Sequence, residues 1–305
     1  MGKLLLRALL TGSALFAIPA AGLGMTTNAA GASETIEAGG RERTYLVHVP
    51  TRRPPKMPLL LVFHGGGGSG QGMPHFTGFD ALADRYGFLA VYPDGVNRQW
   101  NDGGKPNNGV DDVGFVRALI VRLEQQFSID RNRIFAAGIS NGAMFSQRLG
   151  CELADRIAGI AAIDGNMPIA IASSCHPSRA VSVLLMNGTA DPLMPFDGGN
   201  VTIGRRVAVA SASQTVAFWG RHDGCAAAPS PTTLPAVEPA DGTSIEREQY
   251  LHCRDGSKVT FYIVHGGGHT WPGGYQYLPA IFIGRTSNQL DASRTIAEFF
   301  LTLER

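Results

Sequence analysis

The regular alternation of short apolar runs with segments of helical periodicity constrains the fold of this chain most strongly. Continuous apolar runs bounded by turn residues are typical of buried strands, and they occupy 57–65, 88–95, 133–138, 157–165, 180–188 and 258–267. Helical segments lie among them at 76–87, 111–127 and 141–153, and another lies at 291–303. Strands that alternate with helices predict an α/β fold, with a mainly parallel central sheet and helices on both faces.

The rest of the pattern predicts one domain. A strand-like run at Arg43–Pro50 follows the pair Gly39–Gly40, which indicates a hairpin turn. The most irregular stretch, Ala226–Gly242, is typical of a surface loop. No internal repeat or long linker is visible, so we expect a single catalytic domain over residues 33–305.

The first 32 residues have the pattern of a signal peptide. Lys3 and Arg7 precede an apolar run over 8–21, which is short for a bilayer span, and small residues follow it at Ala20–Gly22 and Ala30–Ala32. The alternative is an anchoring helix. We expect cleavage near one of the two small-residue sites, no stable membrane anchor, and a secreted or periplasmic protein.

The four cysteines, Cys151, Cys175, Cys225 and Cys253, suit an exported protein with two disulfides. Three connectivities exist, of which pairing between sequence neighbours is the simplest. No thiolate pair has zinc spacing, so no metal site is expected, and nothing predicts a cofactor. The net charge of +1 gives no reason to expect a nucleic acid partner.

A Gly-x-Ser-x-Gly motif spans Gly138–Gly142, with Ser140 at its centre. A serine in front of a helix is often only a helix N-cap. Here, however, the motif lies between the strand at 133–138 and the helix at 141–153, the context in which such a motif projects a nucleophilic serine. Ser140 is therefore the predicted nucleophile.

A nucleophilic serine requires a base and an acid. Where the serine lies in a Gly-x-Ser-x-Gly turn between a strand and a helix, these follow it along the chain in the order acid, then histidine. Asp191, in a loop after the strand at 180–188, is the predicted acid, and Asp164 is the reserve. His269 is the predicted base because it lies past the strand at 258–267, on a loop flanked by glycines. His265 is expected to be structural.

The reaction also requires two donors for an oxyanion. The backbone N–H of Asn141, next to the nucleophile, is one candidate. The second is expected from the glycine-rich loop after the strand at 57–65, where Gly66 is preferred and the choice among Gly65–Gly67 stays open.

The sequence resembles the secreted polyhydroxybutyrate depolymerase and feruloyl esterase group of α/β-hydrolases. The matching stretches include "LLLVFHGGGGSG", "QWNDG", "GISNGAMFSQRLGCELADRIAGIAAIDGN", "LLMNGTADPLMPF" and "GGGHTWPGG". The resemblance implies an α/β-hydrolase fold and places the nucleophile, acid and base on Ser140, Asp191 and His269. It also implies the disulfides Cys151–Cys175 and Cys225–Cys253.

We therefore predict a serine hydrolase that cleaves carboxylic esters of an oligomeric or polymeric hydroxyalkanoate substrate. The alternatives are a feruloyl or acetylxylan esterase, a polyamide hydrolase such as one acting on poly(aspartic acid), and a non-catalytic polymer-binding protein. Trp100 lies in a loop after a strand end and Trp271 lies two residues after His269. Both are predicted to contact the substrate, and ordinary packing is the alternative. The acyl group and the oligomeric state are not encoded in any pattern we recognise.

Overall fold

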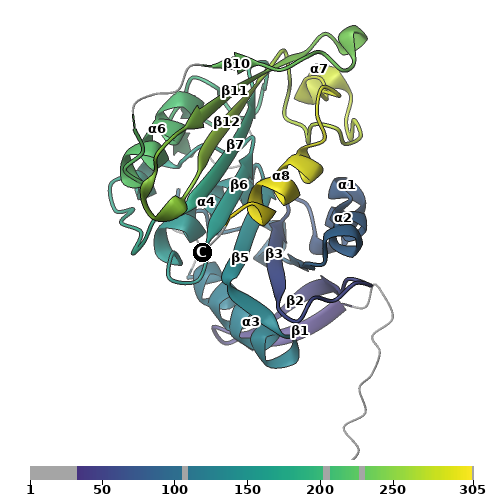
Figure 1. The fold of residues 1–305 in the computed structure, drawn as a ribbon, viewed down its shortest axis with the longest axis vertical. Coiled ribbons are helices and arrows are strands. Elements are labelled where there is room, and N and C mark those ends of the chain that lie inside the picture. The colour runs from purple at the N-terminus through teal and green to yellow at the C-terminus, as the bar shows by residue number, and fades with distance from the viewer. Residues whose placement is uncertain (1–32, 105–108, 202–206, 227–230, 304–305) are drawn as a thin grey trace, which may run out of the picture.

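A ten-stranded sheet forms the centre of the protein, in the order β1-β2-β4-β3-β5-β6-β7-β12-β11-β10 (Figure 1). A computed structural model of the chain describes residues 33–104, 109–201, 207–226 and 231–303. The strands of the large sheet are β1 (Ser33–Ala38), β2 (Arg41–His48), β3 (Met57–Phe63), β4 (Leu89–Pro93), β5 (Ile129–Ile139), β6 (Gly159–Ile163), β7 (Ser182–Gly188), β10 (Thr232–Thr233), β11 (Ser244–Tyr250) and β12 (Val259–His265). A separate small sheet pairs β8 (Gly199–Asn200) with β9 (Ala208–Val209).

The six central strands, from β4 through β3, β5, β6 and β7 to β12, are all parallel to their neighbours. The outer strands at both edges are antiparallel. Every residue of β3, β6 and β7 is buried, as expected for parallel strands that are covered on both faces. The predicted mainly parallel sheet is confirmed. The predicted hairpin also forms, because Gly39 and Gly40 both adopt the positive φ that its tight turn requires.

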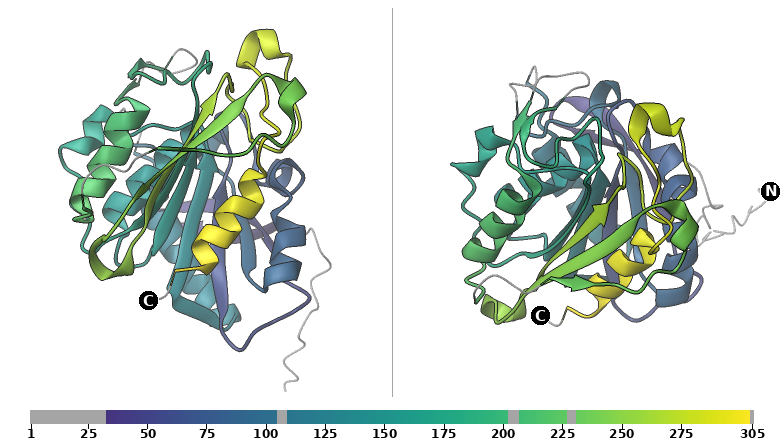
Figure 2. Two further views of the ribbon diagram at one scale, coloured as in Figure 1. Left: turned by 45° about the horizontal axis from the view of Figure 1, so that its top comes forward. Right: turned by 90° about the horizontal axis from the view of Figure 1, so that it is seen from above.

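Helices cover both faces of the sheet, as predicted (Figure 2). The helices are α1 (Met73–Thr77), α2 (Phe79–Tyr86), α3 (Asp112–Gln126), α4 (Asn141–Glu152), α5 (Ile169–Ala172), α6 (Ala212–His222), α7 (Ala280–Ile283) and α8 (Ala292–Leu301). Phe115 of α3, Phe145 of α4 and Trp219 of α6 pack in the core on one face. Phe79 of α2 and Phe300 of α8 pack in the core on the other. The core therefore lies in two layers, one on each side of the sheet.

Both disulfides implied by the resemblance are present. Cys151 is bonded to Cys175 and Cys225 to Cys253, at sequence separations of 24 and 28 residues. Disulfides persist mainly in oxidising compartments. The predicted signal peptide, residues 1–32, lies outside the described residues. Among the residues that are described, no helix has the length and apolar character to cross a bilayer.

The parallel strands place all the predicted reactive residues at one edge of the sheet. Ser140 follows β5, the glycine-rich loop follows β3, Asp191 follows β7, and His269 follows β12. Ligands of open α/β sheets bind outside the carboxyl ends of the strands. The topology therefore brings together segments that are more than 200 residues apart in sequence.

Candidate active site

Ser140 lies in a strained turn between β5 and α4. Its φ of 58° and ψ of −123° lie outside the conformations that non-glycine residues ordinarily adopt. A Cβ on Gly138 would lie 2.5 Å from the carbonyl carbon of Gly142, and a Cβ on Gly142 would lie 2.4 Å from the carbonyl oxygen of Phe63. The two glycines therefore permit the turn. The Ser140 hydroxyl makes no capping hydrogen bond to α4, so the helix-cap explanation of this serine is excluded.

His269 and Asp191 form a buried hydrogen-bonded pair. The imidazole Nδ1 lies 2.7 Å from Asp191 Oδ2, and the two side chains are 5% and 1% exposed. The other carboxylate oxygen of Asp191 accepts the backbone N–H groups of Leu193 and Met194, at 2.7 and 2.9 Å. Because a carboxylate only accepts, Nδ1 of His269 carries a proton and Nε2 is left as the basic nitrogen.

Asp164, the reserve acid, is held differently. It follows β6, and its two carboxylate oxygens accept the backbone N–H groups of Gly188 and Thr270, at 2.9 and 3.0 Å. Burial, together with the charge of Asp191, raises the pKa of the Asp164 carboxyl well above its usual range. The structure thus pairs the imidazole of His269 with Asp191, and Asp164 ties together the loops that carry these two residues.

The electrostatics of His269 predict a pH dependence. Burial lowers the pKa of the imidazole, but the hydrogen bond and charge of Asp191 and the charge of Asp164 outweigh it and raise the pKa above 6.5. A general base must be unprotonated to act. We therefore expect kcat/KM to fall as the pH drops through a value above 6.5, and to be level at higher pH. A pH–rate profile checks this, and an acidic limb below pH 6 would contradict it.

Ser140 and His269 line one cavity of about 720 Å³. Its volume lies within the range of roughly 300–1,000 Å³ common for small-molecule sites. Most of its other side chains are aliphatic or aromatic: Met73, Phe76, Ile139, Met144, Leu193, Val201, Val207, Tyr275, Tyr277, Leu278, Phe282 and Ile283. The Tyr277 hydroxyl also donates to the backbone carbonyl of His269, at 2.9 Å, and so helps to hold the loop that carries His269.

The glycine-rich loop after β3 forms another part of the cavity wall. The backbone N–H of Gly67 donates to the carbonyl of Arg98 at 2.8 Å, and that of Gly68 donates to Gly65 at 2.9 Å. Both groups are therefore already bonded within the protein. Among the described residues the N–H groups of Gly65 and Gly66 have no such partner, which leaves them available to a ligand.

His64 fixes the start of this loop. Its Nε2 accepts the backbone N–H of Gly95 at 3.0 Å, so the ring proton is on Nδ1, which donates to the Gly65 carbonyl at 2.8 Å. Burial lowers the pKa of the imidazole. A neutral, fully bonded His64 therefore sets the direction of the loop.

The predicted substrate contacts of Trp100 and Trp271 are corrected by the structure. Both side chains are buried, at 0% and 1% exposure, and neither lines the cavity. Trp100 stacks on Phe145, with ring centroids 5.1 Å apart, and Trp271 donates from Nε1 to Ser293 at 2.9 Å. Burial of these large apolar rings in the core is favourable, and a position in a loop does not show that a side chain points into a cavity.

Sequence reasoning also missed three polar side chains. Gln99 and Asp102 line the cavity, and the Asn141 carboxamide bonds to the segment that contains them. Asn141 was considered only for its backbone N–H. The sequence shows only that Asn141 is a polar residue at the start of a buried helix, which does not indicate which residue its side chain binds.

Comparison with known proteins finds esterases. A family profile described as phospholipase/carboxylesterase matches residues 107–216. NocK of Nocardia uniformis subsp. tsuyamanensis, named as an esterase, is 35% identical over 87% of this chain and 81% of its own. Feruloyl esterase D of Neurospora crassa is 28% identical over 83% of each chain. The acetyl xylan esterase structure from Aspergillus awamori, at 14% identity, matches with a TM-score of 0.61 over 88% of this chain and 99% of that one.

The sheet, the turn at Ser140 and the histidine–carboxylate pair define an α/β-hydrolase. The chain belongs to the esterases of the α/β-hydrolase fold, and it is an ester hydrolase.

Proposed function

We propose that Ser140, His269 and Asp191 form the catalytic triad of this esterase. In this mechanism Ser140 Oγ attacks the ester carbonyl while Nε2 of His269 removes the hydroxyl proton. The imidazolium is stabilised by Asp191, and it returns the proton to the departing alcohol. Water then hydrolyses the acyl-enzyme by the same route. The hydrogen bond between His269 and Asp191, and the shared cavity of Ser140 and His269, support this assignment.

The backbone N–H groups of Gly66 and Asn141 are the proposed oxyanion donors. Asn141 is the first residue of α4, where backbone N–H groups have no partner within the helix and the helix dipole favours negative charge. Gly66 stands on the opposite loop of the same cavity. The bonding of Gly67 to Arg98 supports Gly66 over Gly67.

For the substrate, we propose an ester with an aromatic acyl group, of the feruloyl type. The aromatic and aliphatic lining of the cavity suits a planar acyl group, and Phe76, Tyr275 and Tyr277 can contact a ring. The relatives named as feruloyl esterases support the same choice. This ranking places the feruloyl alternative ahead of the hydroxyalkanoate substrate.

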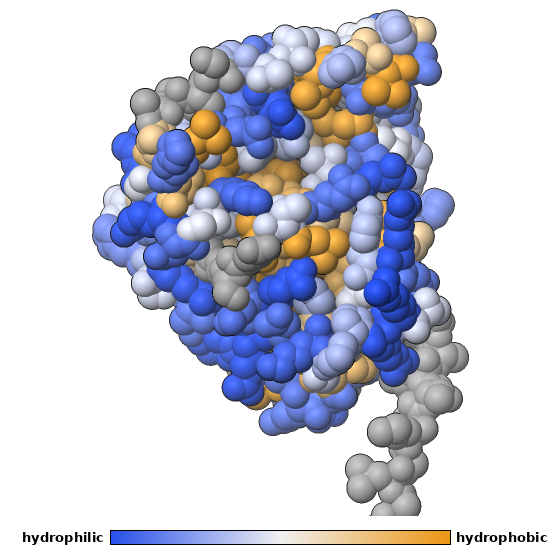
Figure 3. All heavy atoms as spheres, in the orientation of Figure 1, coloured by the Kyte–Doolittle hydropathy of each residue, from blue (hydrophilic) through white to orange (hydrophobic). Residues whose placement is uncertain are grey.

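A hydroxyalkanoate ester is the second candidate, because an apolar rim extends from the cavity to the surface. We define this rim as Tyr275, Leu278, Ile281 and Phe282, which are 46%, 48%, 85% and 64% exposed. Hydrophobic side chains gather at the upper right of Figure 3, where Figure 1 labels α7. Exposed apolar patches often mark binding surfaces. A polyester chain would cover such a rim.

A polyanionic substrate such as poly(aspartic acid) is disfavoured. The cavity lining among the described residues includes the carboxylate of Asp102 and neither lysine nor arginine. The carboxylates of such a substrate would therefore be repelled by the carboxylate of Asp102. Export from the cytoplasm is part of the proposal, and the two disulfides support it.

A hydrolysis panel tests the function. We expect methyl ferulate to be cleaved with a kcat/KM about 100-fold above that of feruloyl amide, and roughly tenfold above that of a hydroxybutyrate dimer ester. Faster cleavage of the amide would overturn the esterase assignment. Faster cleavage of the hydroxybutyrate ester would replace the aromatic substrate with the second candidate.

A further inference from the structure

One segment, Gly95–Asp102, contacts both sides of the proposed oxyanion hole, and we call it the strap. At one end the strap holds the glycine-rich loop. Arg98 accepts the Gly67 N–H and donates from Nε to the Gly68 carbonyl at 3.1 Å. The indole N–H of Trp100 donates to the His64 carbonyl at 3.0 Å.

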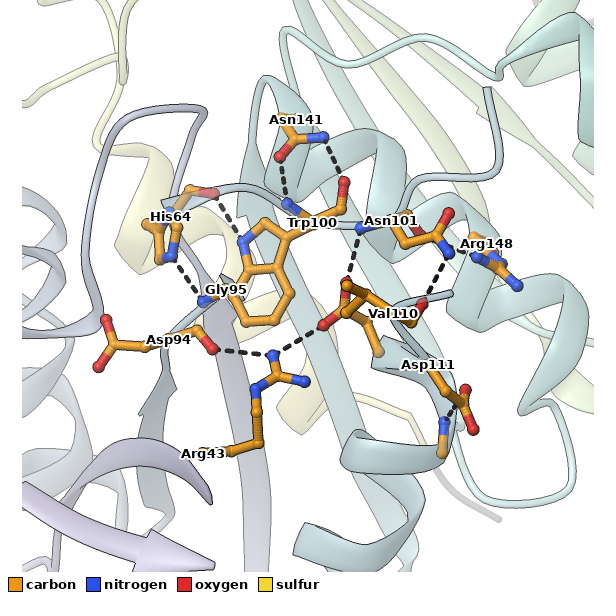
Figure 4. Close-up of polar contacts among 12 residues, drawn as sticks. Arg43, His64, Asp94, Gly95, Trp100, Asn101, Val110, Asp111, Asn141 and Arg148 are labelled. Carbon is orange, nitrogen blue, oxygen red and sulfur yellow. Dashed lines mark hydrogen bonds and ion pairs between the residues drawn. The ribbon is translucent and has the colours of Figure 1, made fainter. Parts of the chain in front are cut away.

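At its other end the strap holds the turn of the nucleophile through the side chain of Asn141 (Figure 4). Asn141 Oδ1 accepts the Trp100 backbone N–H at 2.7 Å, and Nδ2 donates to the Trp100 carbonyl at 3.1 Å and to Asp102 Oδ2 at 2.7 Å. A backbone N–H only donates and a carbonyl only accepts, so the orientation of the carboxamide is fixed. Both N–H bonds of this amide are used.

A buried ion pair fixes the strap to the rest of the fold. Arg43 and Asp112, at 4% and 0% exposure, are 2.7 Å apart. Arg43 also donates to the Asp94 carbonyl, next to the start of the strap, at 3.0 Å, and Asp112 accepts the Asn101 backbone N–H at 2.7 Å. Both ends of the strap are thus held by the same pair, as the lower part of Figure 4 shows for Arg43.

We propose that the strap sets the spacing of the two oxyanion donors, and that Asn141 is the positioning residue that joins the nucleophile turn to it. This inference rests on the proposed function. The backbone N–H of Asn141 and the carboxamide that fixes it belong to the same residue, so movement of the side chain moves the donor. Oxyanion donors act on charge that develops only in the transition state. A loosened Asn141 therefore lowers kcat and leaves KM nearly unchanged.

The test is Asn141→Asp, which keeps the shape and the acceptor but replaces both donors by a carboxylate facing Asp102. We expect kcat per active site to fall about 100-fold, with KM within about twofold of wild type. The inhibition constant of a trifluoromethyl ketone, which forms an oxyanion on the serine, should rise by the same factor as kcat falls. Active sites are counted by fluorophosphonate labelling, so unfolded protein does not contribute.

Gln147→Glu is the matched control. It makes the same amide-to-acid change on the same helix, at a buried residue that bonds the indole of Trp219 at 2.6 Å and the Gly165 carbonyl at 3.2 Å. We expect it to lower the melting temperature while kcat per site and inhibitor affinity stay near wild type. If Asn141→Asp does not fold, Asn141→Ala, which buries no new charge, takes its place with a loss of roughly tenfold or more expected in kcat.

Three results would overturn the inference: unchanged kcat in the Asn141 variants, an equal loss of kcat in Gln147→Glu, or a loss confined to KM. The failure of the proposed function looks different. In that case the wild-type protein itself would show no labelling of Ser140.

Discussion

Replacing Ser140 by alanine is expected to lower kcat/KM for esters by about 10⁴- to 10⁶-fold, because the acyl-enzyme can no longer form. Alanine keeps the Cβ, so the strained backbone at φ 58° is no harder to adopt, and the melting temperature should stay near wild type. Hydrolysis of a p-nitrophenyl ester measures the loss. Mass spectrometry after fluorophosphonate treatment should show an adduct on the wild-type protein and none on the variant.

Ser146→Ala is the control for this experiment. Ser146 lies in α4, six residues after Ser140, and is fully buried, and its hydroxyl donates to the Gly142 carbonyl at 2.9 Å. Its loss removes only a local bond within the helix, so activity should remain close to wild type. If Ser140→Ala kept more than about 1% of the activity, another nucleophile would be required.

The features that could be predicted from the sequence are those set by local patterns. Apolar runs located the central strands, and Gly138 and Gly142 located the turn, because a Cβ at either position would collide with backbone atoms. The sequence also predicts that Ser140, Asp191 and His269 lie at the same edge of the sheet, since each follows its own parallel strand.

The contacts of the strap could not be predicted in the same way. Trp100 and Asn141 are 41 residues apart, and they meet only after β4 and β5 have taken their places in the sheet. A tryptophan next to a motif loop equally suits a pocket wall or a core, and only the packing against Phe145 distinguishes them. The short helix α7 has too few residues to show a period, so the apolar rim was not foreseen either.

The choice between Asp191 and Asp164 also depended on tertiary contacts, because both follow parallel strands. In the structure Asp191 binds its two backbone donors through one oxygen and keeps the other for the imidazole, whereas each oxygen of Asp164 accepts one backbone N–H group. Only Asp191 thus presents an oxygen to the imidazole of His269. The two residues should therefore respond differently to the same substitution.

Asp191→Asn is expected to lower kcat by about 10³- to 10⁴-fold. The Leu193 and Met194 N–H groups both donate to Oδ1 of Asp191, so the oxygen of an asparagine would stay with them. Its NH₂ group would then face Nδ1 of His269 and drive the ring proton onto Nε2. A protonated Nε2 cannot accept the hydroxyl proton of Ser140. Steady-state kinetics at a pH on the level part of the profile measures this loss.

Asp164→Asn, the same substitution one strand away, is the comparison. An asparagine can accept only one of the Gly188 and Thr270 N–H groups, so a buried donor is left unpaired at a cost of about 1–3 kcal/mol of unfolding free energy. We expect denaturant unfolding to show this loss, with kcat reduced by no more than about tenfold, because the pair of His269 and Asp191 remains. The opposite result, a larger loss of kcat in Asp164→Asn than in Asp191→Asn, would transfer the role of the acid to Asp164.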